Sequence, residues 1–392
     1  MLVDLDELPM TGLPQPLHTL ATEPPDPLRI ALVAPPSVEG TPDGCGGVEA
    51  VVADLADALV AAGHSVTLLG AGRSTSRARF VPLWPVPDRL GGPAPEVIHA
   101  AAARRVLVDL ALTEGLDVVH DHTPAGPLNA AVLRSYGVPT VHTVHGPVEE
   151  ATRRYYADLG TDVALVAVSR RQRELAPDLD WLDVVHDALR LEAWPFRAQK
   201  RNYALFLGRF HRQQAPHLAL EAAHAAGLPL VLAGACSEPV EREYFEREVR
   251  PRLWPTDRLV GAPDARRTRE LLLDARCLLF PVQYEEPFGL VMVQAMACGT
   301  PVVALRAGAV PEVVADGVTG LLCDRPDELL AALDRVVELD PRACRARVAG
   351  LFSAERMAES YVSAYRRARA GVGGRTGGAL PGPWPDLLEE AG

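Results

Sequence analysis

Short apolar runs alternate with amphipathic segments along most of the chain, and this alternation predicts the class of fold. Residues 29–34 form an apolar run, and residues 48–62 then repeat apolar side chains at helical spacing. A second apolar run follows at 66–69. Continuous apolar strands are typical of buried parallel sheets, so this strand, helix and strand predict a β-α-β unit.

The same alternation continues on both sides of an interruption at residues 191–201, where Trp194-Pro195 and a polar run intervene. It predicts an α/β protein with two doubly wound, Rossmann-like domains. Further strands are expected at 118–120, 140–143, 163–168 and 184–186 in the first half, and at 203–207, 230–233, 277–280 and 302–305 in the second. Further helices are expected at 216–226, 241–253, 267–275, 290–298 and 354–370.

The domain organisation follows from the interruption and from the composition of the two ends. Residues 1–27 are rich in Pro, Asp and Glu and are expected to form a flexible arm, and the Gly/Pro-rich residues 371–392 a flexible tail. Between them we expect an N-terminal Rossmann-like domain at 28–192 and a C-terminal Rossmann-like domain at 200–352. The helix within 353–370 is expected to cross back to the first domain.

Composition and charge exclude several classes of partner. A length of 392 residues suits two domains. A net charge of −12 argues against nucleic acid, whose phosphates attract basic surfaces. The first residues lack the basic and apolar regions of a secretory signal, and no apolar run approaches the ~20 residues that span a bilayer. Six cysteines lack metal-ligand spacing. We therefore expect a cytoplasmic protein with no membrane span and no structural metal.

The segment 284–319 carries the most specific chemistry in the chain. Its sequence Glu285-Glu286-Pro287-Phe288-Gly289 lies between a predicted strand and a predicted helix, at the edge of the sheet where open α/β proteins bind ligands. The helix that follows offers free backbone N–H groups to a phosphate. A carboxylate at Glu286 is unsuited to a phosphate and suited to the hydroxyls of a sugar.

The whole segment closely resembles the signature of the retaining family 4 glycosyltransferases. In that family the pattern is Glu-x7-Glu within EPFGL…EAMACGTPVVA, and this chain reads EPFGLVMVQAMACGTPVVA. The resemblance extends over residues 29 to about 367 and includes GCGGVE at 44–49, DVVHDHT at 117–123, VHTVHGP at 141–147, GRF at 208–210 and REYFEREVRP at 242–251. It implies a GT-B fold, in which two Rossmann-like domains face each other across a cleft.

The resemblance assigns catalytic roles to three residues. Glu286 would hold the hydroxyls of the donor sugar, His145 would face that sugar from the first domain, and Arg209 would pair with the diphosphate through its guanidinium fork. Two glycines before the helix at 48–62 also form an anion site by their own backbone geometry. The donor-binding residues would be Gly46, Gly47, Gln214, Phe288, Gly289, Leu290, Val291 and Gln294.

Two of these donor-binding residues depart from the family pattern. The second glutamate of the pair, expected on the ribose diol, is Gln294 here, and the family's lysine after Gly-Arg is Gln214. Lys200 is the only lysine in the chain, so no other lysine replaces it. Because the lost cation would stabilise charge developing on the leaving diphosphate, its absence bears on the rate of the reaction. One lost negative charge at Gln294 and one lost positive charge at Gln214, together with an unchanged EPFG loop, favour a donor site that has been remodelled.

The expected reaction moves a sugar, with retention, from a UDP- or GDP-sugar to a small soluble acceptor. The resemblance implies that the leaving phosphate helps to deprotonate the acceptor and that no metal or other cofactor takes part. His120-Asp121-His122 is the nearest metal-like cluster, but it matches the family's strand end. Three alternatives stay open: a catalytically silent relative that binds a nucleotide or a partner enzyme, a transferase acting on sulfur or nitrogen in specialised metabolism, and a GT-B nucleotide-sugar epimerase. The sequence leaves the oligomeric state open.

Overall fold

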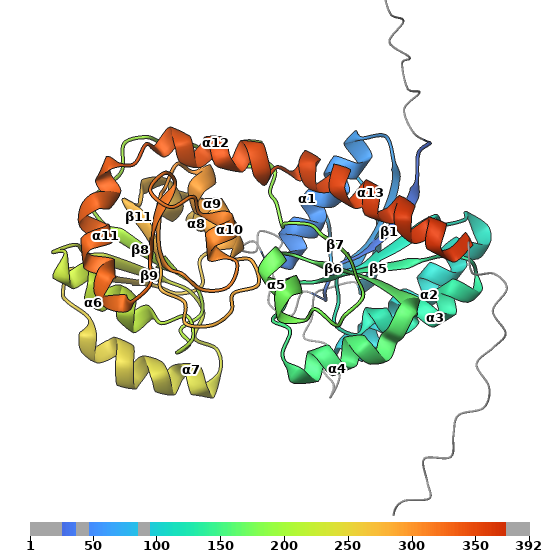
Figure 1. Cartoon of the computed structure of the whole chain (residues 1–392), viewed down its shortest axis with the longest axis horizontal. Coiled ribbons are helices and arrows are strands. Elements are labelled where there is room, and N and C mark those ends of the chain that lie inside the picture. The colour runs from blue at the N-terminus through green and yellow to red at the C-terminus, as the bar shows by residue number, and fades with distance from the viewer. Residues whose placement is uncertain (1–25, 37–46, 85–94, 374–392) are drawn as a thin grey trace, which may run out of the picture.

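Two parallel β-sheets, one in each half of the chain, dominate the computed structural model, which describes residues 26–36, 47–84 and 95–373 (Figure 1). The first sheet has the order β3-β2-β1-β4-β5-β6-β7 and the second β10-β9-β8-β11-β12-β13. The first comprises β1 Arg29–Val33, β2 Ser65–Ala71, β3 Arg79–Trp84, β4 Val118–Asp121, β5 Thr140–Val144, β6 Val163–Ala167 and β7 Trp181–Val184. The second comprises β8 Ala204–Leu207, β9 Leu230–Ala233, β10 Arg258–Val260, β11 Cys277–Phe280, β12 Val302–Leu305 and β13 Gly320–Cys323. The predicted α/β class with two doubly wound sheets is confirmed.

Helices cover both sheets, and the last of them returns to the first half. The first half carries α1 Val48–Ala61, α2 Pro95–Thr113, α3 Ala130–Ser135, α4 Glu150–Leu159 and α5 Arg170–Leu175. The second carries α6 Pro216–Ala225, α7 Pro239–Tyr244, α8 Ala265–Asp274, α9 Leu290–Ala297, α10 Val310–Val313, α11 Leu329–Arg335 and α12 Pro341–Leu351. The helix α13, Ala354–Gly373, runs from α12 across the first half (Figure 1). Its Met357, Tyr361 and Tyr365 are buried in one apolar cluster with Leu55 and Leu59 of α1.

The strands that sequence patterning misplaced or missed all lie at sheet edges. The sequence pattern did not predict β3, β10 or β13. The predicted strand 184–186 is wrong, because β7 is Trp181–Val184. β10 is largely exposed, and β3 has no fully buried residue. Edge strands face water on one side, and β3 and β10 accordingly lack the continuous buried run that marks a central parallel strand. This reason does not apply to β13, whose residues are mostly buried.

The predicted helix 241–253 is also corrected. α7 ends at Tyr244, and the chain continues as one π-helical turn, Phe245–Val249, and one 3₁₀ turn, Arg250–Arg252. Pro251 has no backbone N–H to donate, which prevents a regular α-helix from running through this point.

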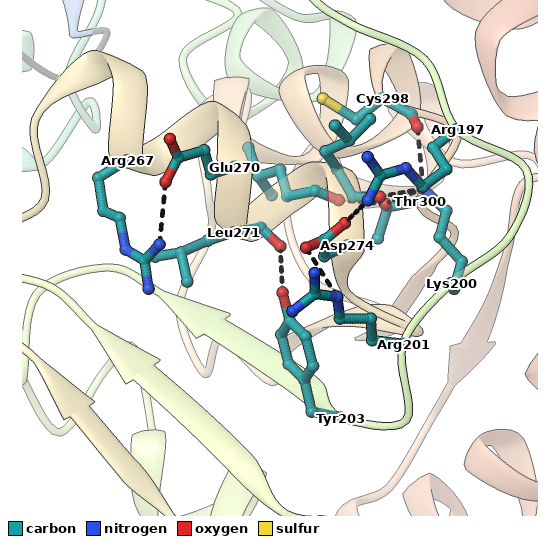
Figure 2. Close-up of polar contacts among 12 residues, drawn as sticks. Arg197, Lys200, Arg201, Tyr203, Arg267, Glu270, Leu271, Asp274, Cys298 and Thr300 are labelled. Atoms are coloured by element: carbon teal, nitrogen blue, oxygen red, sulfur yellow. Dashed lines mark hydrogen bonds and ion pairs between the residues drawn. The ribbon is translucent and has the colours of Figure 1, made fainter.

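The chain between the two sheets is tied to the second half by buried polar contacts (Figure 2). Lys200 Nζ donates to Leu273 O at 2.9 Å, to Cys298 O at 2.9 Å and to Thr300 Oγ1 at 2.8 Å. These carbonyls lie at the ends of α8 and α9, where backbone oxygens lack a helical partner. Asp274 pairs with Arg197 and, at 3.1 Å, with Arg201. Lys200, the only lysine, therefore uses all three of its N–H donors to hold the connecting segment against the second half, and none is left for a substrate.

The chain crosses between the halves twice, and the two crossings run side by side. Leu189 N donates to Phe352 O at 3.1 Å, and Ala354 N donates to Leu189 O at 3.1 Å. Leu189 and Ser353 form an isolated parallel bridge. A relative motion of the halves would turn about this paired crossing, close to the interruption of the pattern at 191–201.

Candidate active site

Each sheet reverses its strand order between two central strands, and the predicted site residues gather at these switch points. In the second sheet the reversal lies between β8 and β11. Arg209 follows β8, and the loop with Glu286 follows β11. In the first sheet it lies between β1 and β4, and Gly47 precedes α1 in the connection that leaves β1. Open α/β sheets bind ligands at such points. Gly46 lies outside the described residues.

Two glycines assemble the loop around Glu286. Gly289 begins α9 with a φ of +82°, and a Cβ there would lie 2.4 Å from Met292 Cε. Gly308, with a φ of +54°, brings the loop before α10 against the backbone of Glu286, since a Cβ would lie 2.2 Å from its nitrogen. Ala309 N then donates to Glu286 O at 2.8 Å. Only glycine adopts these conformations without strain and leaves the space that the approach needs. The segments 285–289 and 308–309 thus form one rigid unit.

The carboxylate of Glu286 is held by three donors from its own loop. It accepts hydrogen bonds from the backbone N–H groups of Phe288 and Gly289 and from the hydroxyl of Tyr284. Burial raises the pKa of Glu286, and these three hydrogen bonds oppose that rise. A carboxylate offers about four lone-pair positions, so one direction remains for a hydroxyl of a ligand. Of the four residues predicted to bind the donor at the start of α9, Phe288 and Gly289 here use their backbone N–H groups to hold Glu286.

Tyr284 connects Gln214 to Glu286. Gln214 Nε2 donates to the Tyr284 hydroxyl at 3.0 Å, and that hydroxyl donates to Glu286 Oε2. Burial and the neighbouring carboxylate raise the pKa of Tyr284, so it stays a donor at neutral pH. The residue predicted to contact the donor directly is therefore engaged with another side chain of the site. Sequence reasoning gave Tyr284 no role, although its place just before Glu285-Glu286 was a signal.

Arg209 pairs with two carboxylates in this structure. Its Nε donates to Glu241 Oε1 at 2.6 Å and its Nη2 to Glu238 Oε1 at 2.5 Å. Glu241 is fully buried, and its other oxygen accepts from the backbone N–H groups of Ser237 and Glu238. A diphosphate that recruits Arg209 would therefore compete with two carboxylates, neither of which the sequence prediction included.

The remaining predicted donor residues lie at the start of α9. Phe288 is buried and its ring lies 5.8 Å from that of His186 in the first half. Leu290 packs against apolar clusters of both halves. Gln294 is 5% exposed, so its side chain belongs to the interior of the second half. Gly289 and Val291 share the half-buried first turn.

On the first sheet, His145 follows β5 beside two other polar side chains. His122 Nδ1 lies 2.9 Å from His145 Nε2, and Asp187 Oδ1 lies 3.5 Å from His145 Nδ1. Gln172 of α5 donates at 2.8 Å to both Val144 O and Gly146 O, the carbonyls flanking His145. Sequence reasoning missed Asp187, which follows the misplaced edge strand β7.

Ion pairs join the His145 edge of the first sheet to the Glu286 loop of the second. Arg171, next to Gln172 on α5, donates to both oxygens of Glu285 at 2.8 and 2.9 Å. Glu312 of α10 accepts from the backbone N–H groups of Arg170 at 3.0 Å and Arg171 at 2.8 Å, and pairs with His186 at 3.0 Å. α5 and α10 lie between the two halves (Figure 1). His145 and Glu286 are thus held on facing edges of the two sheets.

Two surface cavities lie away from these facing edges. One of about 380 Å³ is lined by β13 and α11, including Asp316, Cys323 and Arg335. Another of about 260 Å³ lies at the start of β5 and β6, beside Arg134 and Arg367. Neither contains a predicted site residue, so the chemistry points to the facing edges instead.

The cluster His120-Asp121-His122 is buried and takes part in hydrogen bonds within the first half. His120 is bonded to Tyr365 and Thr143, each at 2.7 Å, and Asp121 Oδ1 accepts from the N–H and hydroxyl of Thr123. Across residues 26–36, 47–84 and 95–373, no group of three or more His, Cys, Asp or Glu is arranged to hold a metal ion.

These buried histidines make the fold sensitive to acid. Burial lowers the pKa of His142 to about 3 and those of His120 and His122 well below 6.5, while it raises the pKa of Asp121 to about 7. Below pH 6.5 these histidines bind protons in the unfolded state but stay neutral in the folded state, so the unfolding free energy falls as the pH falls. Asp121 binds its proton at a higher pH in the folded state than in the unfolded state, so it raises the unfolding free energy as the pH falls. Three such histidines against one aspartate predict a net loss of unfolding free energy as the pH falls below 6.5. Other histidines with a lowered pKa act in the same direction: His64, His99 and His217.

The acid sensitivity is measured by urea unfolding at pH 7.0 and 5.5. We expect a lower unfolding free energy at pH 5.5, and His142→Gln should reduce the difference between the two pH values by about 1 kcal/mol. Equal unfolding free energies at the two pH values would contradict the assignment of these histidines as neutral.

Sequence models of two related families match the chain, one in each half. The family described as Glycosyltransferase Family 4 matches residues 45–180, and the one described as Glycosyl transferases group 1 matches residues 192–350. Together with two Rossmann-like sheets whose switch-point loops face each other, these matches define a glycosyltransferase of the GT-B architecture. Within that class, the chain belongs to glycosyltransferase family 4.

Individual relatives support the same class of enzyme. The chain is 28% identical over 409 residues to D-inositol 3-phosphate glycosyltransferase of Mycolicibacterium smegmatis, covering 89% of this chain and 93% of that protein. It is similar to AviGT4, a glycosyltransferase involved in avilamycin A biosynthesis, with 26% identity, a TM-score of 0.64 and coverage of 88% of this chain and 99% of the other. Sucrose-phosphate synthase from Thermosynechococcus elongatus shares the fold at 22% identity and a TM-score of 0.71, with coverage of 88% and 100%.

No described helix of the chain combines the length and the apolar character that crossing a membrane requires.

Proposed function

We propose that the protein transfers a glycosyl group, with retention of configuration, from a UDP- or GDP-sugar to a small soluble acceptor in the cytoplasm. The observation that carries the proposal is the Glu286 loop. It presents one free direction of a carboxylate at the switch point of the second sheet, facing the His145 edge of the first. A carboxylate in this place suits sugar hydroxyls, and the start of α9 suits a phosphate.

In the proposed reaction the bond between the sugar's anomeric carbon and the diphosphate oxygen breaks while the bond to the acceptor oxygen forms on the same face. The acceptor's proton passes to an oxygen of the leaving diphosphate, which balances the charge. Glu286 orients the sugar through its hydroxyls, and His145 faces it from the other sheet. No metal or other cofactor is part of the proposal.

Two relatives support a small acceptor. The Mycolicibacterium protein is a D-inositol 3-phosphate glycosyltransferase, and AviGT4 is involved in avilamycin A biosynthesis. A role in specialised metabolism, with an oxygen, sulfur or nitrogen acceptor, is consistent with both.

A catalytically silent, nucleotide-binding relative is the second candidate. Two observations favour it. Gln214, which stands where the family has a lysine, is neutral and bonded to Tyr284. Arg209 is paired with Glu238 and Glu241, so neither of the family's two cations is available to the diphosphate in this structure. The discriminating experiment is a thermal-shift screen of nucleotide sugars, followed by the mass of any transferred product. Stabilisation by a nucleotide sugar with no turnover would favour the silent relative; turnover would exclude it.

We also propose that the two halves close on the donor by turning about the paired crossing at Leu189 and Ser353. Saturating UDP or GDP is then expected to lower the radius of gyration in small-angle X-ray scattering, because binding energy shifts the population toward the closed state. Identical scattering profiles with and without a nucleotide that binds would contradict closure.

A further inference from the structure

Three polar side chains meet at the carboxyl edge of the first sheet, one after each of β4, β5 and β7. They are His122, His145 and Asp187, which form a row in which His145 is the middle member. All three are nearly buried: His122 is 4% exposed, and the side chains of His145 and Asp187 are 11% and 10% exposed. Buried polar atoms of this kind need hydrogen-bond partners, so the positions of the protons in the row are constrained.

One arrangement of protons suits the row better than its reverse, although His145 Nδ1 and Asp187 Oδ1, 3.5 Å apart, form no hydrogen bond in this structure. Burial, followed by the neighbouring histidines, lowers the pKa of His122, so its ring carries a single N–H. If His145 Nδ1 holds its proton, it donates toward Asp187 Oδ1, and Nε2 accepts from His122 Nδ1. The reverse tautomer would place the Nδ1 lone pair against a carboxylate. It would also leave an N–H at His122 Nε2, an atom that is buried and has no hydrogen-bond partner.

We infer that Asp187 is a positioning residue that fixes His145 in its Nδ1–H form, with His122 as the donor to Nε2. The inference rests on the proposed function, in which His145 faces the donor sugar. In this tautomer Nε2 of His145 has a lone pair and accepts a hydrogen bond. A ligand group that replaces His122 at Nε2 must therefore be a donor, such as a hydroxyl or an amine. A sugar hydroxyl meets that requirement, and an ether or a carbonyl does not.

Other contacts hold the backbone on both sides of His145 and the neighbouring His122 ring. The role left to Asp187 is to determine which ring nitrogen of His145 carries the proton. Gln172 bonds the carbonyls of Val144 and Gly146 on either side of His145. The His122 ring lies 3.9 Å from that of His120, which is itself bonded to Tyr365 of α13. The 3.5 Å between Asp187 Oδ1 and His145 Nδ1 exceeds a good hydrogen bond by about 0.5 Å, a gap that a small side-chain shift closes.

The tautomer is measured directly by NMR on full-length protein labelled with ¹⁵N-histidine. The spectrum distinguishes a protonated from an unprotonated ring nitrogen, and the signals missing from His145→Gln assign His145. We expect Nε2 to be the unprotonated nitrogen in the wild type. In Asp187→Asn the negative charge is lost and either the oxygen or the NH₂ of the amide can face Nδ1, so we expect the preference for the Nδ1–H form to fall and the Nε2–H form to become populated. Asp187→Glu, which restores a carboxylate, should keep the wild-type form.

A matched variant separates the two neighbours of His145. His122→Phe keeps a ring against His120 and removes the donor to Nε2, so the His145 proton should stay on Nδ1. The inference is overturned if Nδ1 is the unprotonated nitrogen in the wild type, if the wild type and Asp187→Asn have the same tautomer populations, or if His122→Phe moves the proton.

Donor turnover with UDP-glucose or GDP-mannose gives a second, independent readout. Asp187→Asn is expected to lower kcat by about 10²-fold with little change in KM, since a wrongly protonated His145 affects the transition state more than binding. Asp187→Glu should recover part of the loss. If the NMR result holds and the wild type turns over no nucleotide sugar, the proposed function fails and the positioning by Asp187 stands.

Discussion

Replacing Glu286 by alanine is expected to abolish glycosyl transfer in a protein that remains folded. Glu286 lies in the loop at the switch point of the second sheet, and the chain holds its carboxylate with Tyr284 and two backbone N–H groups. Removing a preorganised polar contact to the reacting sugar typically lowers the rate by about 10²–10³-fold. Gly289 and Gly308 set the path of the backbone, so the loop should keep its shape.

The measurement is kcat/KM for the wild type, Glu286→Ala and Glu286→Gln, with thermal unfolding as the check on folding. Glu285→Ala is the matched control, because Glu285 is the adjacent carboxylate and pairs with Arg171 instead of facing a ligand. We expect Glu285→Ala to retain most of the activity and both Glu286 variants to lose it. An unchanged kcat/KM in folded Glu286→Ala would remove Glu286 from the site.

Restoring the family's residues at both departures is expected to lower activity on the native donor. A lysine at Gln214 would lose the hydrogen bond to Tyr284 and place a cation close to Glu286, which would draw that carboxylate away from the sugar. Gln294→Glu would bury a charge at a position that is 5% exposed. We therefore expect the double variant to lose at least about tenfold in kcat/KM, equal to 1.4 kcal/mol of transition-state stabilisation.

The two substitutions are best compared as a cycle of wild type, each single variant and the double variant. A remodelled site predicts that each single variant loses activity and that the double variant does not recover it. A clear gain in the double variant on the native donor would mean that the site is a weakened form of the family arrangement.

The central strands of both sheets could be predicted from the sequence, and the edges could not. The strands 230–233, 277–280 and 302–305 match the structure because each is a continuous apolar run buried on both faces. All four edge strands were missed or misplaced. β7 contains Asp183, and β3 contains Pro82. Such residues suit an edge and disrupt the apolar pattern.

The positions of the predicted site residues followed from motif and topology, but their partners did not. Glu286 and Arg209 could be placed because a loop after a parallel strand lies at a known edge of the sheet. The pairing of Arg209 with Glu241, and of Glu312 with His186, joins residues more than 30 and 120 positions apart in the sequence. Contacts over such distances depend on the packed fold, and a single sequence gives no local pattern for them.

The mass of the product formed from a panel of UDP- and GDP-sugars tests the central claim most directly. Wild-type protein and Glu286→Ala are incubated with each nucleotide sugar and a mixture of small hydroxyl, thiol and amine acceptors. We predict that the wild type forms an acceptor heavier by one glycosyl unit, with release of the nucleoside diphosphate, and that Glu286→Ala forms none. A nucleotide sugar that binds the wild type and is recovered unchanged, with no glycosylated product from any acceptor, would contradict the claim.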